Sequence, residues 1–406
     1  MSSHQDFVII GAGPTGCALG AYLARGGASV TLVEAVERPE SVVGESMLPC
    51  SRVVFDELGL DTTGFLVKRG AVFCASEADG GGSVRFDFSE AEDPVYTHAW
   101  QVQREVFDLR WRDVATAHGC AIVYAKVTEV NVAGGRVESS AGAFEAGRIV
   151  DTGGRTMWLS QKLGLRVGDA RLKNSAVGTR MRGVRALGRD QPGDITICCI
   201  PGGWIWIIPF GEGIASVGVV MSPDCPLRGS AEERFNGAMA LSPEAWSRLQ
   251  DAERILPLRG LQDFTASSKS FHGPGFALCG DAATFIDPVF SSGVLLGLCG
   301  ARSLAPALLD GSESALDRWQ AEYRDGAGIF RKVIDHWYAG DFMTVALAEP
   351  RLQKPYYRRG IVSLLAGDVY NPARTSPRRM AERMGELAAK VREHGGATRT
   401  TGEATG

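Results

Sequence analysis

Features that mark several other classes of protein are scarce in this 406-residue sequence. Its nine cysteines form no CxxC pair, so a structural zinc site, a disulfide framework and a bound metal are not predicted. Lys and Arg number 43 against 47 Asp and Glu, which leaves no basic surplus for binding nucleic acid. No run of 18 apolar residues occurs, and the polar stretch Met1–Asp6 lacks a secretory leader pattern. We therefore expect a reduced, cytoplasmic protein without a membrane span.

Glycine, by contrast, is abundant. It supplies 51 of the 406 residues, about 13%, where about 7% is usual. The glycines follow no fixed period, which excludes a collagen-like chain, and 45% hydrophobic residues provide enough apolar surface for a folded core. The length predicts two or three domains. The surplus of glycine indicates many turns, and backbone that comes close to a ligand.

The start of the sequence predicts a β-α-β unit that binds a dinucleotide. A buried strand at 6–10 runs into a GxGxxG turn, which is followed by a helix and by a strand ending in an acidic residue. The glycines allow a tight turn, close approach of a pyrophosphate and close packing of helix on strand, and the acid suits a ribose hydroxyl. This pattern does not distinguish FAD from NAD, and by itself it also occurs as an ordinary strand–helix turn. The candidate cofactor-binding residues are Gly11, Gly13, Pro14, Thr15, Gly16 and Glu34.

An α/β domain built on this unit is predicted over three segments: 1–75, 100–165 and 270–310. Within them, Asp281 follows Gly280 at the end of an apolar strand, Arg104 begins the segment REVFD at 104–108, and DTGGR at 151–155 matches a DxxGR element. In these motifs and their order the chain resembles the FAD-dependent monooxygenase fold of the para-hydroxybenzoate hydroxylase type. The resemblance implies a Rossmann-type FAD-binding domain in which Arg104 and Asp281 contact FAD.

The rest of the chain is predicted to form two further parts. Residues 76–99 and 166–269 contain short alternating strands separated by Gly, Pro and Asp, which predict an antiparallel sheet domain inserted on the substrate side. A helical pattern covers 311–394. Residues 395–406 have no periodicity and predict a disordered tail.

The hexamer WIWIIP at 204–209 narrows the chemistry. On a strand, Trp204, Trp206 and Ile208 share one face, and an arbitrary WxW would most often be part of a core strand. As WxWxIP, however, it resembles the signature of the flavin-dependent halogenases. In that family the two tryptophans are thought to separate the flavin from the organic substrate, so the resemblance assigns Trp204 and Trp206 to the catalytic site.

Three more segments resemble the same family. GESMLP at 44–49 is similar to its flavin loop, FLVKRGA at 65–71 to the segment with its catalytic lysine, and DPVFSSGV at 287–294 to its halide-binding element. Outside that context, Lys68 would be read as an exposed lysine beside Arg69 on a solvated loop. Ser291 or Ser292 is a suitable N-cap, and amides at such a helix end suit a halide ion. The resemblance therefore implies a catalytic Lys68, flavin contacts from Glu45, Ser46, Gly293 and Val294, and halide contacts from Ser292 and Gly293.

The resemblance also implies an activity. In this family reduced FAD and dioxygen form a peroxyflavin, which oxidises chloride or bromide, and the lysine guides the hypohalous species to the substrate by a hydrogen bond or as a haloamine. Tryptophan-type members have a glutamate where this chain has Phe290, which favours the branch that acts on phenols and pyrroles in the biosynthesis of secondary metabolites such as antibiotics. Many members of that branch act on substrates carried by a carrier protein, and tethering is left open here.

No second GxGxxG follows a strand, so we expect a separate flavin reductase to supply the reduced FAD. Two alternatives remain at this level. One is an FAD-dependent aromatic hydroxylase on the same scaffold, and the other is a non-catalytic homologue that binds flavin or a carrier protein.

Overall fold

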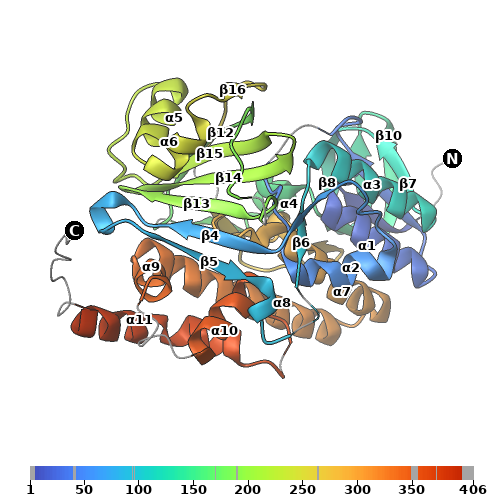
Figure 1. Cartoon of the computed structure of the whole chain (residues 1–406). Helices are drawn as coiled ribbons and strands as arrows, with labels where there is room; N and C mark the ends of the chain where they lie inside the picture. Colours follow the sequence, from blue (N-terminus) through green and yellow to red (C-terminus); the bar gives the residue numbers. More distant parts are fainter. Residues whose placement is uncertain are drawn as a thin grey trace, which may run out of the picture.

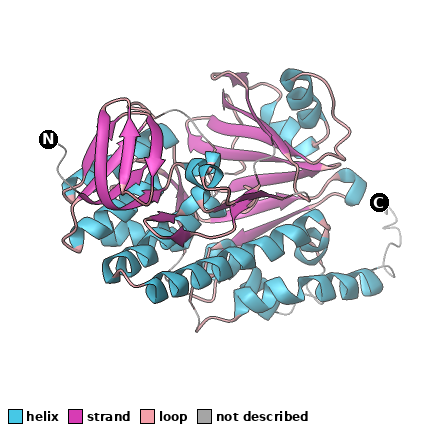
Figure 2. Ribbon diagram, turned by 180° about the vertical axis from the view of Figure 1, so that it is seen from behind, coloured by secondary structure: helices cyan, strands magenta, loops and turns pink. Residues whose placement is uncertain are grey.

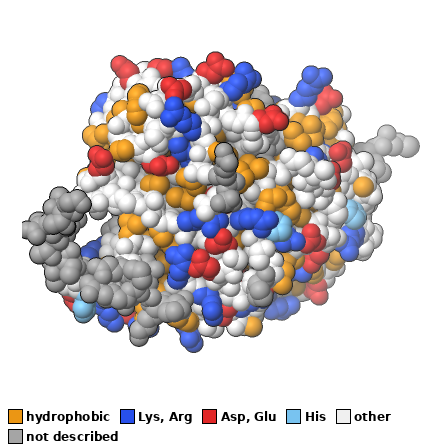
Figure 3. Space-filling model, viewed as in Figure 1, with side chains coloured by type: hydrophobic (Ala, Val, Ile, Leu, Met, Phe, Trp, Pro, Cys, Tyr) orange, Lys and Arg blue, Asp and Glu red, His pale blue; other side chains and the backbone are white. Residues whose placement is uncertain are grey.

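A computed structural model describes residues 5–39, 43–93, 95, 97–169, 171–188, 191–262, 265–348, 355–371 and 373–395. Two sheets lie side by side, and a group of helices runs beneath them (Figures 1 and 2). Lys and Arg side chains are interspersed with Asp and Glu over the face that Figure 3 shows, so no field of a single sign covers it.

The first sheet has a parallel core in the order β20, β10, β1, β2, β7. Strand β1 contains the apolar run Phe7–Ile10, which is buried because helices cover the sheet. Helix α1 follows β1 directly and packs against α3 and α7. A meander of β8 and β9 extends β10, and β19 pairs antiparallel with β20. The bounds are β1 (Gln5–Ile10), α1 (Pro14–Arg25), β2 (Val30–Glu34), α3 (Arg104–Ala117), β7 (Ala121–Tyr124), β8 (Val127–Asn131), β9 (Arg136–Ser139), β10 (Gly142–Asp151), β19 (His272–Gly273), β20 (Phe276–Leu278) and α7 (Ser292–Asp310).

The second sheet runs in the order β16, β12, β15, β14, β13, β4, β5, with β17 also on β12. Among the described residues all its pairs are antiparallel except β4 with β13. β14 alternates: Trp204, Trp206 and Ile208 join the main core, while Ile205 and Ile207 pack under α5. The bounds are β4 (Gly70–Cys74), β5 (Ser83–Asp87), β12 (Ser175–Arg182), β13 (Ile195–Ile200), β14 (Gly203–Gly211), β15 (Ile214–Met221), α5 (Ala231–Ala240), α6 (Pro243–Leu249), β16 (Glu253–Arg254) and β17 (Arg259–Gln262).

The position of β4 bears on the predicted domain boundaries. This strand lies inside the 1–75 segment that we expected to belong to the cofactor domain, but it pairs with β13 of the second sheet. The pairing favours a boundary before Gly70, and the division into domains remains a prediction. Two short strands lie beside this point, β3 (Leu66–Lys68) and β6 (Ala99–Gln101), which pair with each other, and Gln101 also forms an isolated bridge with Ser46.

The C-terminal helices α8, α9, α10 and α11 pack on one another below the second sheet (Figure 1). Their bounds are α8 (Glu313–Tyr338), α9 (Asp341–Ala346), α10 (Pro355–Leu365) and α11 (Ser376–Gly395). Gly395, the first residue of the predicted disordered tail, ends α11, and residues 396–406 lie outside the described residues. By length and composition α7 is apolar enough to cross a membrane, but 61% of that window is buried inside the fold. It contacts α1 and α8, as a core helix does. The remaining elements are α2 (Arg52–Leu58), α4 (Trp158–Lys162), β11 (Arg166–Gly168), β18 (Ala266–Ser268) and β21 (Thr284–Phe285).

Candidate active site

The GxGxxG turn joins β1 to α1 with little space to spare. Gly11 has a φ of 95°, and a Cβ on Gly16 would lie 2.1 Å from the Gly11 carbonyl oxygen. A Cβ on Gly13 would meet nothing within 4 Å, so the turn is open at that residue. No side chain caps α1, which leaves its first amides available to an anion. The geometry fits a pyrophosphate at this end of the site.

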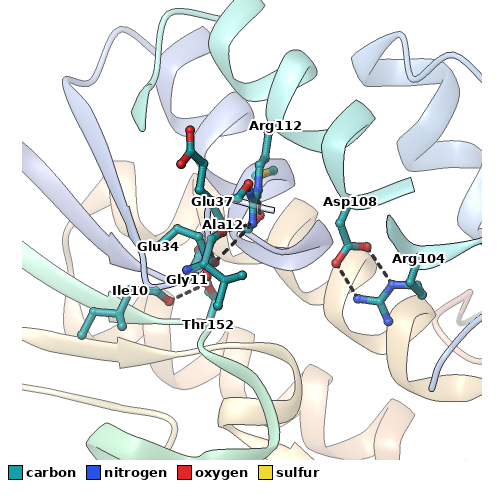
Figure 4. Close-up of polar contacts among 11 residues, drawn as sticks. Ile10, Gly11, Ala12, Glu34, Glu37, Arg104, Asp108, Arg112 and Thr152 are labelled. Carbon is teal, nitrogen blue, oxygen red and sulfur yellow. Dashed lines mark hydrogen bonds and ion pairs between the residues drawn. The ribbon is translucent and has the colours of Figure 1, made fainter. Parts of the chain in front are cut away.

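Glu34 is held in place by the same turn. One of its carboxylate oxygens accepts the Ala12 N–H at 2.7 Å and the other accepts the Val36 N–H at 2.9 Å. The buried Arg112 of α3 donates to the carbonyl oxygens of Ala12 at 3.2 Å, Glu37 at 2.6 Å and Val36 at 2.9 Å (Figure 4). Arg112 thus ties the two loops of the predicted nucleotide site together. Nothing in the sequence indicates this role of Arg112, because its partners are backbone carbonyls that no motif records.

Arg104 and Asp281 lie near each other, and both are predicted to contact FAD. Asp108, one turn along α3, orients Arg104 through a bidentate pair of 2.7 and 2.9 Å (Figure 4). Arg104 also donates to the Val43 carbonyl at 3.2 Å. Burial raises the pKa of Asp281 to about 6, and the charges of Arg155 and Arg104 oppose that rise. A carboxylate in this position suits hydroxyl groups that donate to it.

A cavity brings the predicted motifs together from distant parts of the chain. Its walls are apolar on the side of the second sheet and polar at the flavin loop and the α7 terminus. These walls fit a flat aromatic ring with a polar edge, which is what a flavin requires. Residues that line it include Gly44, Glu45, Ser46, Arg104, Arg155, Ile195, Trp204, Trp206, Ile208, Asp281, Asp287, Ser291, Ser292, Gly293 and Val294.

The two tryptophans form one side of the cavity. Trp204 and Trp206 are 2% and 4% exposed, with ring centroids 6.0 Å apart. Glycines on the neighbouring strands make room for Trp206, since a Cβ on Gly178 or Gly218 would lie 2.6 or 2.2 Å from its ring. The Trp206 indole Nε1 donates to the Ser216 hydroxyl at 3.2 Å. We call Trp204 and Trp206 the tryptophan wall.

Glu45 is buried beside this wall. Burial raises its pKa, which hydrogen bonds and the charge of Arg180 counteract. Arg180 donates to Glu45 at 3.2 Å and also pairs with Glu105 on α3. Arg180 and Ser216 had no signal in the sequence, because they come from strands of the second sheet that no motif connects to the flavin loop.

Lys68 is 1% exposed, so the reading as a solvated surface lysine is wrong. Its Nζ donates to the Ser46 hydroxyl at 2.9 Å and to the Met47 carbonyl at 3.0 Å, and lies 5.3 Å from the centre of the Phe88 ring. Within the part of the chain that the structure describes, no carboxylate forms an ion pair with it. Burial therefore lowers the pKa of Lys68 to about 7. The lysine reaches the cavity through Ser46, and its role stays a prediction.

The predicted halide element forms the start of α7. Ser291 is the N-cap, with a φ of 56°, but its side chain makes no capping hydrogen bond, contrary to our expectation of a capping serine. Ser292 begins the helix and is buried. The Ser291 side chain thus leaves the first amides of α7 uncapped, and residues 291–294 line the cavity together with the tryptophan wall.

Comparison with known proteins decides the family. The family model described as tryptophan halogenase matches residues 6–93 and 84–342. The chain belongs to this halogenase family. The family name does not identify the substrate of this chain.

Three similar proteins span nearly the whole chain. The 1H-pyrrole-2-carbonyl-(peptidyl-carrier protein) chlorinase of Pseudomonas fluorescens is 28% identical in an alignment of 433 positions, gaps included. The alignment covers 96% of this chain and 95% of that protein. The structure of a flavoprotein/dehydrogenase from Cytophaga hutchinsonii has a TM-score of 0.88 and 27% identity, and covers 97% of this chain and 100% of that one. The structure of a flavin-dependent brominase has a TM-score of 0.84 and 25% identity, and the match covers 96% of this chain and 100% of the brominase chain.

These findings confirm the central predictions from the sequence. The protein is an FAD-dependent oxidoreductase of the halogenase family with a Rossmann-type FAD-binding fold, and the hydroxylase alternative is disfavoured. FAD and a halide are the cofactor and co-substrate of these halogenases, and the residues of the cavity fit both. The assignment of single residues to FAD, halide and catalysis remains a prediction.

Proposed function

We propose that this protein uses reduced FAD, dioxygen and chloride or bromide to halogenate an electron-rich phenol or pyrrole in the biosynthesis of a secondary metabolite. The observation that carries the proposal is a buried lysine of lowered pKa that contacts Ser46, which lines the same cavity as the tryptophan wall. A hydroxylase has no need of such a wall, because its flavin must reach the substrate. The pyrrole chlorinase among the relatives supports the substrate class.

Each part of the site then has a task. When bound, reduced FAD would supply the two electrons that bring dioxygen to the peroxide level, at which it oxidises the halide to hypohalous acid and leaves water. The turn at Gly11–Gly16 and Glu34 binds the nucleotide end, and Arg104 and Asp281 bind the middle of the cofactor. The amides at Ser292–Val294 hold the halide, because a helix N-terminus favours an anion without adding a fixed cation. The wall keeps the organic substrate away from the flavin.

Lys68 acts last in this scheme. Two of its three N–H donors, when it is protonated, are used by Ser46 and Met47, which leaves one for the oxygen of hypohalous acid. That hydrogen bond holds the oxidant and makes its halogen more electrophilic toward the ring. A protonated Lys68 thus directs the halogen to one carbon of the substrate.

Two partners belong to the proposal. A separate reductase supplies the reduced FAD, since the sequence contains no second dinucleotide motif. The aromatic substrate arrives on a carrier protein, as the name of the pyrrole chlorinase states for that relative. Cytoplasmic location agrees with the need for both partners.

Substitution of Lys68 tests the function. Lys68→Met keeps the volume of the buried chain but removes its N–H donors, and we expect halogenated product to fall at least about a hundredfold. Product mass is measured with FAD, a reductase, bromide and free or carrier-bound phenols and pyrroles. Lys126→Met, at an exposed lysine, is the matched control and should halogenate like the wild type. Full halogenation by Lys68→Met, or hydroxylated product from the wild type, would contradict the proposal.

A further inference from the structure

Tyr338, the last residue of α8, binds Trp204 of the tryptophan wall. The indole Nε1 of Trp204 donates to the Tyr338 hydroxyl at 3.3 Å, and this hydroxyl donates to the Asp287 carboxylate at 2.8 Å. Asn174 completes the cluster, since its Nδ2 donates to the Tyr338 hydroxyl at 2.7 Å and to Asp287 at 3.1 Å. The neighbouring Trp337 packs its ring in the core, whereas the Tyr338 hydroxyl binds polar partners.

Asp287 gives the cluster its rigidity. It is 3% exposed, and a buried carboxylate is stable only where donors compensate for the lost water. Tyr338 and Asn174 provide two such donors, and the backbone N–H of Val289 gives a third at 3.0 Å to the other oxygen. Because Asp287 must be satisfied from several sides, each donor is confined to one orientation. The Tyr338 hydroxyl is therefore in a fixed position when it accepts from Trp204.

The cluster connects the three parts of the molecule. Trp204 lies on β14 of the second sheet, and Asn174 directly precedes β12 of that sheet. Asp287 starts the predicted halide element, and Tyr338 ends the C-terminal helix α8. Trp204 and Asp287 both line the cavity, so the Tyr338 hydroxyl links the wall to the halide element. Trp206 differs in this respect, since its indole binds Ser216 on the adjacent strand of its own sheet.

We propose that Tyr338 is a positioning residue, which fixes the Trp204 indole against the halide element. The fixed indole prevents hypohalous acid and substrate from passing through the tryptophan wall. This inference rests on the proposed function for its consequence, but the anchoring itself is a property of the protein alone. Without the hydroxyl, the indole N–H loses its acceptor and Asp287 loses one donor, so the ring gains freedom to move. Oxidant then escapes by routes other than the one past Lys68.

Tyr338→Phe tests the anchoring without any cofactor. In protein labelled with ¹⁵N at the tryptophan indoles, the resonance of Trp204 is identified by its absence in Trp204→Phe. We expect the Trp204 indole N–H to exchange with solvent about tenfold faster in Tyr338→Phe than in the wild type. Tyr356→Phe, at a tyrosine that is 45% exposed, is the matched control and should leave the rate unchanged. An unchanged rate in Tyr338→Phe overturns the anchoring.

The consequence is tested in the complete system with FAD, reductase, bromide and an accepted aromatic substrate. A soluble trap for hypobromous acid competes with that substrate, and the share of bromine caught by the trap is measured. We expect this share to rise about threefold to tenfold in Tyr338→Phe, with a FAD dissociation constant like that of the wild type. Faster indole exchange with an unchanged share would overturn the role in closing the wall. A wild type that oxidises no halide would refute the proposed function, while the exchange result would still decide the anchoring.

Discussion

Lys68 lies in surroundings that disfavour its charge, yet in the proposed reaction it acts as a charged donor. Burial lowers the pKa of Lys68 to about 7, while Asp194 at a greater distance opposes that effect. The ammonium form is therefore lost as the pH rises through about 7, well below the usual range for lysine. At the residue scale, this places the change of protonation within the range in which an enzyme works.

The pH dependence of halogenation follows from this pKa. If the ammonium group binds hypohalous acid, product formation per oxidised FAD should fall as the pH rises through about 7. The measurement is single-turnover bromination between about pH 6 and 9, with a check that FAD remains bound. A yield that rises over the same interval would instead favour a neutral amine that forms a haloamine.

Arg112 offers a second prediction at this scale. Arg112→Met removes three hydrogen bonds to the loops beside Glu34, so we expect FAD to bind about tenfold to a hundredfold more weakly. Titration of the protein with FAD, followed by flavin fluorescence, gives the dissociation constant. Arg110→Met is the control on the same helix, because Arg110 donates to the carbonyls of Asp61 and Thr63. Equal weakening in both variants would contradict a specific role for Arg112.

At the element scale, β12, β14 and β15 are matched so that large rings on one strand face glycines on its neighbours. Trp206 pairs with Gly218 on β15, and its ring also lies over Gly178 on β12, two strands away. A side chain at either glycine would occupy the volume of the indole. The orientation of the Trp206 ring thus depends on two glycines, Gly178 and Gly218, which have no side chain.

Gly218→Ala should displace the Trp206 ring, because the new Cβ would lie 2.2 Å from it. We expect a loss of about 1–3 kcal/mol in the free energy of unfolding and an altered near-UV circular dichroism spectrum. Gly260→Ala on β17 is the matched control, since its Cβ would come no closer than 3.8 Å to another atom. A spectrum and stability equal to the wild type in Gly218→Ala would show that the wall does not depend on this glycine.

At the scale of the whole molecule, the two sheets and the C-terminal helices meet in one large core, with smaller clusters on the other face of each sheet. The Phe342 ring of α9 lies 5.0 Å from Phe73 of β4, 5.1 Å from Phe290 of the halide element and 5.7 Å from Trp337 of α8, measured between ring centroids. Phe290 is thus part of the core that holds the C-terminal helices. A charged residue would be costly there.

Phe342→Ala should destabilise all parts together, by about 3–5 kcal/mol, because it opens a cavity where they meet. Chemical denaturation followed by circular dichroism and by the release of FAD should give coincident transitions at a lower denaturant concentration. Leu309→Ala, at a side chain 43% exposed, should change stability little. Separate transitions for the helices and for FAD would contradict a shared core.

Local patterns in the sequence determined much of this protein. The β1–α1 turn, the Glu34 acid, the WxWxIP strand and the halide element all consist of neighbouring residues, so steric and hydrogen-bonding rules that act over a few positions define them. Family, cofactor and fold class followed from their order along the chain. Lys68 could be assigned a role only by resemblance, because nothing in its own neighbourhood distinguishes it from a solvated lysine.

Only the tertiary structure decided how these segments work together. Arg112, Arg180, Ser216 and Tyr338 bind partners that are distant in sequence or that are backbone atoms, so no spacing reveals them. The burial of Lys68, and with it the lowered pKa, depends on Ser46, Met47 and Phe88 closing around one amine. The abundant glycines have the same dual character. Those in the GxGxxG turn could be interpreted from the sequence. Gly178 and Gly218 are needed only because the sheet places them against the Trp206 ring, which leaves no room for a side chain.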